Sequence, residues 1–186
     1  MSAPFLVSPP DVLPVTLEQA KQHLRIDHND DDDLIMNYLH GAISYLDGYS
    51  GIMGRALAPQ VWQQNFPPGI GVFCLSLGPA QELIRVSCID PGNQLIEQDI
   101  SLFSLQGTSK GSQVTAYSLP ALARRPDAVQ IQYRAGYADA ESIPNAVRVA
   151  ILFLVQRFYD GADKSVDADI DRAVSNLIAP FRLRVL

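Results

Sequence analysis

Length, composition and charge set the first limits on this chain. It has 186 residues, of which 47% are hydrophobic and 18% are charged, and its formal net charge is −6. This size suits one domain, or one and a half, with a real hydrophobic core. The acidic balance argues against a general nucleic-acid binder, which would show a basic surface. The first ten residues have neither the basic nor the long apolar segment of a signal peptide, so none is expected.

The first third of the chain predicts a pair of helices. Residues 1–14 are rich in proline and are expected to run extended, like an arm. A short helix should begin at Thr16, because Thr16 and Gln19 have the spacing of a capping box. A second helix is predicted over residues 31–49, with one apolar stripe formed by Ile35, Leu39, Ala42, Ile43 and Leu46.

An acidic segment, Asp27 to Asp33, joins the two predicted helices. Asp27, Asn29 and Asp31 have the alternating spacing of a calcium loop, but position six is not glycine and position twelve is not glutamate. Carboxylates are stabilised at the positive end of a helix dipole, so a helix start is the better interpretation. No metal site is predicted. The acidic residues singled out are Asp27, Asp30, Asp31, Asp32 and Asp33.

The middle of the chain predicts strands. Short alternating segments, separated by Gly and Pro, recur over residues 56–135, and a turn is expected at Asp90–Asn93. We therefore expect an α+β fold. A helical body of about four helices, residues 1–55 and 136–186, should carry an inserted antiparallel β region, residues 56–135. The strand candidates are Gln60–Phe66, Val72–Leu77, Leu83–Ile89, Gln94–Glu97, Asp99–Leu105, Gln113–Tyr117 and Ala128–Tyr133.

A third helix is predicted over residues 143–159, with Ser142 as its N-cap and Gly161 just past its end. It has almost no polar face, and two arginines make it too interrupted for a membrane span. Such a helix must be buried on several sides. We favour partial burial by another subunit, with an ordinary central core helix as the alternative. The candidate interface residues are Arg148, Leu152, Val155, Arg157 and Tyr159.

The end of the chain predicts a fourth helix and a tail. After a polar hinge at residues 160–167, the helix should run over residues 168–179 and end at Pro180. The tail alternates apolar and basic residues, has no evident partner within the chain, and would suit strand addition to another protein. Its residues are Phe181, Arg182, Leu183, Arg184, Val185 and Leu186.

The sequence offers little catalytic chemistry. Its three histidines and two cysteines lie in no nucleophile, metal or redox motif, so no catalytic residue, cofactor or metal is predicted. Paired carboxylates within Asp30–Asp33 could do acid–base work, although a solvated acidic cap is the simpler interpretation. Trp62, Tyr117 and Tyr133 could form a ligand platform in the β region, but aromatic residues on strands more often pack in a core.

An ordered set of short motifs resembles the head–tail connector, or adaptor, proteins of tailed phages, in the longer branch with an inserted β region. The resemblance covers nearly the whole chain, although Gly51–Gly54 contains an extra residue or two, which leaves the geometry of that loop open. The motifs are Val15–Asp27, Asp32–Ile35, Gly54–Leu57, Val129–Tyr133, Ala135–Tyr137, Ile143–Pro144 and Leu177–Arg182.

The resemblance implies a non-enzymatic structural protein of the virion neck, assembled in the host cytoplasm. Proteins of this family form a ring, usually of twelve copies, under the portal protein, and they dock a tail or stopper protein. It also implies that the tail, Phe181–Leu186, reaches the portal, and that DNA passes through the lumen without sequence-specific binding. We expect the acidic segment to face that lumen, since acidic walls repel phosphate. The alternatives are another neck or tail-completion protein, or a ligand-binding module in the β region.

Overall fold

Thr16 starts the first helix in the computed structural model, which describes residues 2–69, 71–108, 111–161 and 164–183. Thr16 Oγ1 accepts the backbone N–H of Gln19 at 3.3 Å, and Gln19 Oε1 accepts the backbone N–H of Thr16 at 3.0 Å. This reciprocal pair confirms the predicted capping box and starts α1 (Leu17–Leu24). The helix ends at Arg25, which adopts the left-handed conformation with a φ of 61°.

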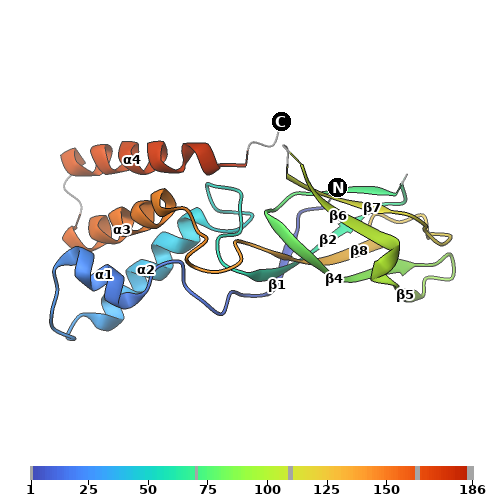
Figure 1. Cartoon of the computed structure of the whole chain (residues 1–186), viewed down its shortest axis with the longest axis horizontal. Coiled ribbons are helices and arrows are strands. Elements are labelled where there is room, and N and C mark those ends of the chain that lie inside the picture. Colours follow the sequence, from blue (N-terminus) through green and yellow to red (C-terminus); the bar gives the residue numbers. More distant parts are fainter. Residues whose placement is uncertain (1, 70, 109–110, 162–163, 184–186) are drawn as a thin grey trace.

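The helical end of the molecule is built around α3. It comprises α1, α2 (Asp32–Leu46), α3 (Asn145–Asp160) and α4 (Lys164–Ile178), followed by a short 3₁₀ helix, η2 (Ala179–Phe181). Helix α3 contacts α1, α2 and α4 (Figure 1). None of the described helices combines the length and the hydropathy that crossing a bilayer requires.

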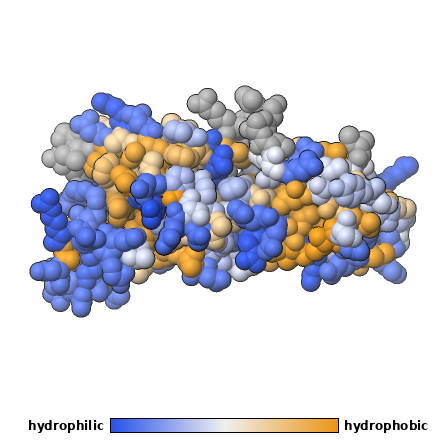
Figure 2. All heavy atoms as spheres, viewed as in Figure 1, coloured by the Kyte–Doolittle hydropathy of each residue, from blue (hydrophilic) through white to orange (hydrophobic). Residues whose placement is uncertain are grey.

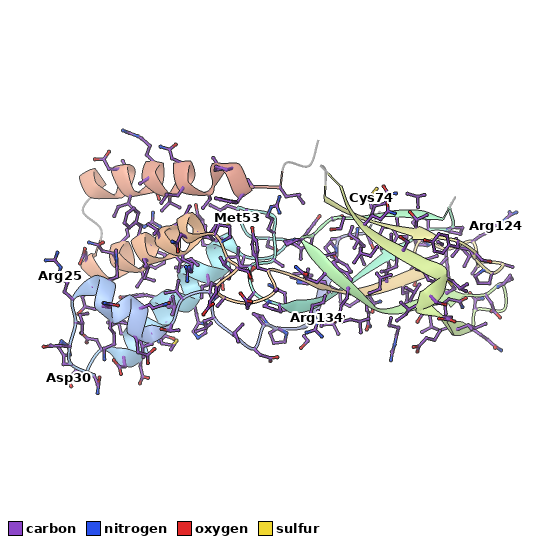
Figure 3. The ribbon with its side chains drawn as sticks, in the orientation of Figure 1. Arg25, Asp30, Met53, Cys74, Arg124 and Arg134 are labelled. Carbon is purple, nitrogen blue, oxygen red and sulfur yellow. The ribbon has the colours of Figure 1, made fainter. Side chains whose placement is uncertain are left out.

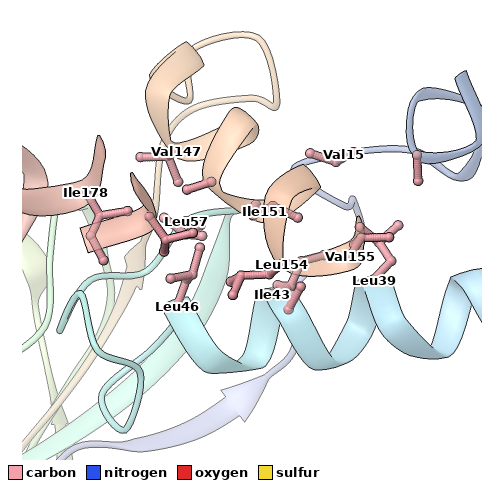
Figure 4. Packing of buried hydrophobic residues seen from close by; sticks show 14 of the residues in the cluster. Val15, Leu39, Ile43, Leu46, Leu57, Val147, Ile151, Leu154, Val155 and Ile178 are labelled. Carbon is pink, nitrogen blue, oxygen red and sulfur yellow. The ribbon is translucent and has the colours of Figure 1, made fainter. Parts of the chain in front are cut away.

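The missing polar face of α3 is explained by its own chain. Its fully buried residues interlock with the predicted stripe of α2, all of which is buried (Figure 4). The central-core alternative therefore describes most of α3, and only a strip remains for a partner, with Val149 36% exposed. The buried residues of α3 are Val147, Ala150, Ile151, Leu154 and Val155.

Two helix starts differ from the prediction, and α2 ends at Leu46, three residues before its predicted end. Pro144, with an extended ψ of 133°, is the N-cap of α3, so the helix begins at Asn145. Ser142 is not the cap, because its backbone N–H and its hydroxyl both donate to Asp139 Oδ1, at 2.6 and 2.7 Å. Helix α4 begins at Lys164, four residues before the predicted start, so the polar hinge is shorter than expected.

The strands form two antiparallel sheets at the other end of the molecule (Figure 1). One sheet has five strands in the order β1-β2-β8-β4-β5, and the other has three in the order β3-β7-β6. The strands are β1 (Phe5–Ser8), β2 (Gln60–Phe66), β3 (Val72–Leu75), β4 (Ala80–Ile89), β5 (Leu95–Gln98), β6 (Phe103–Thr108), β7 (Gly111–Ala116) and β8 (Val129–Ala135). The α+β class with an antiparallel β region is therefore confirmed.

Local chemistry explains one difference between the strands and the prediction, at the start of β6. The candidate Asp99–Leu105 begins with a 3₁₀ turn, η1 (Ile100–Leu102), because Asp99 Oδ1 accepts the backbone N–H of Ser101 at 2.9 Å. The turn expected at Asp90–Asn93 is present, since Asp90 Oδ1 accepts the N–H of Gln94 at 2.9 Å. The expected N-terminal arm is extended, and part of it is strand β1, which pairs with β2.

Each end of the molecule has its own hydrophobic core. One cluster of buried residues lies among the helices, and a second lies between the two sheets, where the Phe66 and Phe73 rings are 5.2 Å apart. The chain crosses between the two ends through residues 9–16, 47–59 and 136–144. At the last crossing Gly136 has a φ of +119°, and a Cβ there would lie 2.2 Å from the Ala58 carbonyl oxygen. A side chain cannot be placed at this close approach.

Candidate subunit-contact and docking surfaces

A groove runs between α1 and the first half of α3. Its volume is about 350 Å³. Two of the predicted interface residues, Arg148 and Leu152, line it. The remaining lining residues were not predicted, although the polar spacing of Gln19, Gln22 and His23 on one side of α1 is a signal that could have found them. The full lining is Val15, Gln19, Gln22, His23, Asn145, Arg148, Val149 and Leu152.

Arg148 gives this groove an unsatisfied donor. Its Nη2 donates to Asn145 Oδ1. Its Nε is buried and has no hydrogen-bond partner among the described residues. A buried donor without an acceptor costs about 1–3 kcal/mol. An acceptor brought into the groove by another protein would remove that cost.

The other predicted interface residues are engaged inside the chain. Val155 is fully buried in the helical core. Arg157 makes an ion pair with Asp171 of α4 and lies over the Phe158 ring, 5.2 Å from its centroid. Tyr159 donates its hydroxyl to Asp31 Oδ2 at 2.8 Å, and this bond raises the pKa of the Tyr159 phenol. These three side chains hold the helical end together.

The acidic loop is partly neutralised by one lysine. Lys21 Nζ donates to Asn29 Oδ1 and to Asp32 Oδ1, both at 2.6 Å. Asp31 is engaged with Tyr159. The exposed members are Asp27, Asp30 and Asp33. In the described part of the chain, no group of three or more His, Cys, Asp and Glu side chains is placed to hold a metal ion.

The acidic loop lies at the tip of the helical end. Figure 3 shows Asp30 at one end of the long axis and Arg124 at the other. Figure 2 shows hydrophilic residues around the acidic loop, and hydrophobic residues over parts of both the helical end and the strand end. Arg125, the neighbour of Arg124, is held by Asp127 through two hydrogen bonds of 2.6 and 2.8 Å, which lower the pKa of the Asp127 carboxyl.

The start of the C-terminal tail is docked on the chain itself. Arg182 Nε donates to the Ile52 carbonyl and Leu183 N donates to the Met53 carbonyl, both at 2.9 Å. The expectation that the tail has no partner within the chain is therefore wrong for these two residues. Phe181 ends η2 and is half-buried. The remaining predicted residues, Arg184, Val185 and Leu186, lie outside the described residues.

The three aromatic residues of the alternative ligand platform are not brought together at a surface. Trp62 and Tyr133 are buried in the core of the β region, and burial raises the pKa of the Tyr133 phenol. Tyr117 is 72% exposed, beyond the end of β7. Trp62 Nε1 donates to Gln60 Oε1 at 3.0 Å, so its polar atom is also satisfied internally. The core interpretation holds for two of the three residues.

Comparison with known proteins gives one family match. The sequence profile described as "Phage gp6-like head-tail connector protein" matches residues 14–74. This segment contains α1, α2, β2 and all but the last residue of β3, and it includes the Val15–Asp27, Asp32–Ile35 and Gly54–Leu57 motifs. No curated protein gives a significant match.

Solved structures match the chain over its whole length. A chain in "Neck of empty GTA particle computed with C6 symmetry" superimposes with a TM-score of 0.79 at 18% identity. A chain in "Virion of native gene transfer agent (GTA) particle" gives 0.78 at 20% identity, and one in "Neck of native GTA particle computed with C12 symmetry" gives 0.73 at 19%. Each match covers 100% of this chain and 98% of the other.

These findings agree with the sequence motifs. The profile covers the N-terminal motifs, and the structural matches extend the shared fold through the β region to α4. At 18–20% identity the structural matches establish the fold. The resemblance predicted from the sequence is thus confirmed: residues 14–74 match the profile of phage gp6-like head-tail connector proteins, and the whole chain has the fold of chains found in gene transfer agent particles.

Proposed function

We propose that this chain is a structural, non-enzymatic subunit of a virion neck, a head–tail connector that forms a ring with copies of itself beneath a portal protein. The fold match over the full chain carries this proposal, because the matched structures include necks with C6 and C12 symmetry. The profile match to head-tail connector proteins supports the same role from the sequence. Assembly would take place in the host cytoplasm, and the finished ring would lie between head and tail.

The groove between α1 and α3 is the surface proposed for the contact between neighbouring subunits. Val149 and Leu152 supply an apolar strip beside the unsatisfied Arg148 Nε. A neighbouring subunit could bring a hydrogen-bond acceptor to Arg148 Nε and apolar side chains to cover Val149 and Leu152. In a cyclic ring every subunit offers two different surfaces to its neighbours, so the groove is one half of that contact.

The C-terminal tail is the surface proposed for the portal. Arg182 and Leu183 fix its start against the loop at Ile52 and Met53. The alternation of apolar and basic residues over 181–186 suits strand addition to a partner. A separate protein, either a virion tail protein or a stopper protein, would dock on another face of the ring.

The acidic loop is proposed to face the DNA channel. Asp27, Asp30 and Asp33 are exposed at the tip of the helical end, whereas Asp32 forms an ion pair with Lys21. An acidic lining keeps DNA mobile, since it releases no counterions on contact. A structure of the assembled ring with this loop on the outer surface would refute the proposal that the loop faces the DNA channel.

The proposal is tested by mixing the chain with the portal protein encoded by the same genome. Light scattering after size exclusion should show the portal peak gaining about 245 kDa, the mass of twelve copies of a 20.4 kDa chain. A mixture that shows no gain with the portal, and none with the tail or stopper proteins, would contradict the connector role. A gain only with a tail protein would favour a different neck or tail-completion role.

A further inference from the structure

The five-stranded sheet ends in two open edges that are unusually apolar. Strand β1 forms one edge, and its Phe5, Leu6 and Val7 side chains are 49%, 45% and 47% exposed. Strand β5 forms the other, with Leu95 58% and Ile96 44% exposed. Charged residues commonly protect open edges from pairing, but β1 contains none. Strand β5 contains one charged residue, Glu97, whose Oε2 lies 3.4 Å from Arg85 Nε of β4. Among the described strands none lies beside the outer side of β1 or β5, so both leave apolar side chains at an open edge.

The two edges match each other in length and direction. Each strand has four residues. All neighbouring strands in the order β1-β2-β8-β4-β5 are antiparallel, and the number of strands is odd, so β1 and β5 run in the same direction. If β5 of one copy lies beside β1 of a second copy that is oriented the same way, as neighbours in a ring of many copies nearly are, the two strands are parallel. The same step can then be repeated from copy to copy.

We propose that β1 of one copy and β5 of a second copy of this chain form a parallel edge-to-edge contact, which is part of the interface between subunits. This inference rests on the ring of the proposed function and adds a second contact to it, at the strand end. A contact between two different surfaces is heterologous, and repetition of such a contact generates a closed ring. Pairing of β1 with another β1, in contrast, would be antiparallel and would stop at a dimer.

The chain limits this contact to a short segment. Pro4 precedes β1 and Pro9 follows it closely, and a register shift lies between Leu6 and Ser8. Proline cannot donate a backbone hydrogen bond, so pairing beyond the four residues is blocked. This explains how an uncharged edge can serve one specific partner without promoting open-ended aggregation.

Engineered disulfides provide the test. Cys74 is exposed and is first replaced by serine, whereas Cys88 is buried and stays. Phe5→Cys and Leu95→Cys are then introduced together, because a parallel contact brings these strand starts side by side. Leu95 is chosen over Ile96, since Ile96 lies opposite Cys88 in β4 and a cysteine there would pair within the chain. The matched control combines Phe5→Cys with Gln98→Cys, about 10 Å further along β5.

The sample is the set of particles produced from the genome that encodes the chain, oxidised mildly and run on a denaturing gel without reductant. The Phe5→Cys, Leu95→Cys chain should give a ladder of multimers. The control pair and each single variant should remain at least tenfold weaker in cross-linking. Dimers from Phe5→Cys alone would show β1–β1 pairing and overturn the proposal. Particles that contain the double variant without a ladder would also overturn it, while the connector role would stand.

Two further outcomes separate the inference from the proposed function. If the Cys74→Ser chain never enters particles, the connector role fails and the edge contact fails with it. If only the double cysteine variant is excluded from particles, the contact is tested instead with a pair of opposite charges, one placed on each strand. Leu6→Lys alone and Ile96→Glu alone should lower incorporation at least tenfold, and the two together should restore it. If the single and combined variants are all folded by circular dichroism, but the combined variant does not regain incorporation into particles, the proposed contact is overturned.

Discussion

Asp47 Oδ1 accepts the backbone N–H of Leu57 at 2.6 Å, and this bond ties the end of α2 to the segment that enters the β region. The same carboxylate accepts Gln60 Nε2 at 3.0 Å through Oδ2, and Gln60 in turn accepts the indole N–H of Trp62. One half-buried carboxylate therefore connects the helical core to the core between the sheets.

Replacing Asp47 by alanine should destabilise the whole chain. The substitution leaves the Leu57 N–H and the Gln60 amide without their acceptor, and an unsatisfied buried donor costs about 1–3 kcal/mol. The free energy of unfolding, measured in urea, should fall by about that amount. Asp33→Ala is the control, because Asp33 is an exposed carboxylate at the start of the same helix. Equal, small losses in both variants would contradict the role of Asp47.

The stability of the chain should also depend on the protonation of Asp47. Burial raises the pKa of this carboxyl above its ordinary value of 3.8, so the folded state binds its proton more tightly than the unfolded state does. Stability from this group is present below the ordinary pKa and is lost as pH rises through the raised value. The free energy of unfolding of the wild type, minus that of Asp47→Asn, should fall as pH rises from below 3.8 through the raised pKa of Asp47. A difference that stays flat or rises would refute this assignment.

Helix α4 should be held by its buried side chains more than by its ion pair. Ile178 is fully buried, so Ile178→Ala should cost about 2–5 kcal/mol. Asp171 is 58% exposed in its ion pair with Arg157, so Asp171→Ala should cost less than about 1 kcal/mol. Thermal unfolding of the two variants side by side checks this order, and the reverse order would contradict it.

Removal of residues 184–186 should separate folding from portal binding. Arg182 and Leu183 keep their bonds to Ile52 and Met53 in this variant, so its thermal midpoint should match that of the full chain. Portal binding, measured by light scattering of the mixture, should be lost. Removal of residues 182–186 is the comparison and should lower the midpoint as well. Unchanged portal binding by the shorter truncation would argue against the tail as the portal contact.

A charge placed in the groove between α1 and α3 should block assembly without unfolding the chain. Val149 is 36% exposed, so glutamate at this position reaches water in the monomer but would be buried against a neighbour. Val149→Glu should therefore abolish the ring on the portal, while its circular dichroism spectrum stays unchanged. Leu34→Glu, at a 43% exposed position of α2, is the matched control. Equal assembly of both variants would exclude the groove as an interface.

The sequence predicted the elements well where a local rule dominates. The capping box of α1, the buried stripe of α2, the bounds of β2 and the turn at Asp90–Asn93 all follow from neighbours a few residues apart. The covering of α3 was harder to foresee, because it depends on three other helices closing around it. Pairing of β1 with β2 joins residues about 58 positions apart, as Phe5 with Gln63, and local alternation carries no information about it.

The candidate surfaces show the same division. The hydrophobicity of α3 pointed to Arg148 and Leu152, which do line an open groove. The same hydrophobicity could not show that Val155 is buried inside the chain, because tertiary packing decides which side of a helix is covered. The docking of Arg182 and Leu183 on backbone carbonyls was also invisible in the sequence, since carbonyl groups carry no residue identity.

The three chain crossings between the helical end and the strand end have a mechanical consequence. Two bodies joined by a single linker can swing about it, whereas three segments, residues 9–16, 47–59 and 136–144, connect these bodies. The last two are also bonded to each other, since Tyr137 N donates to the Leu57 carbonyl at 2.9 Å. A twist of one body against the other would have to distort all three connections together, including the tight approach of Gly136 to Ala58. We therefore expect the two ends to move together, so that a push on the acidic tip would be transmitted to the strand end.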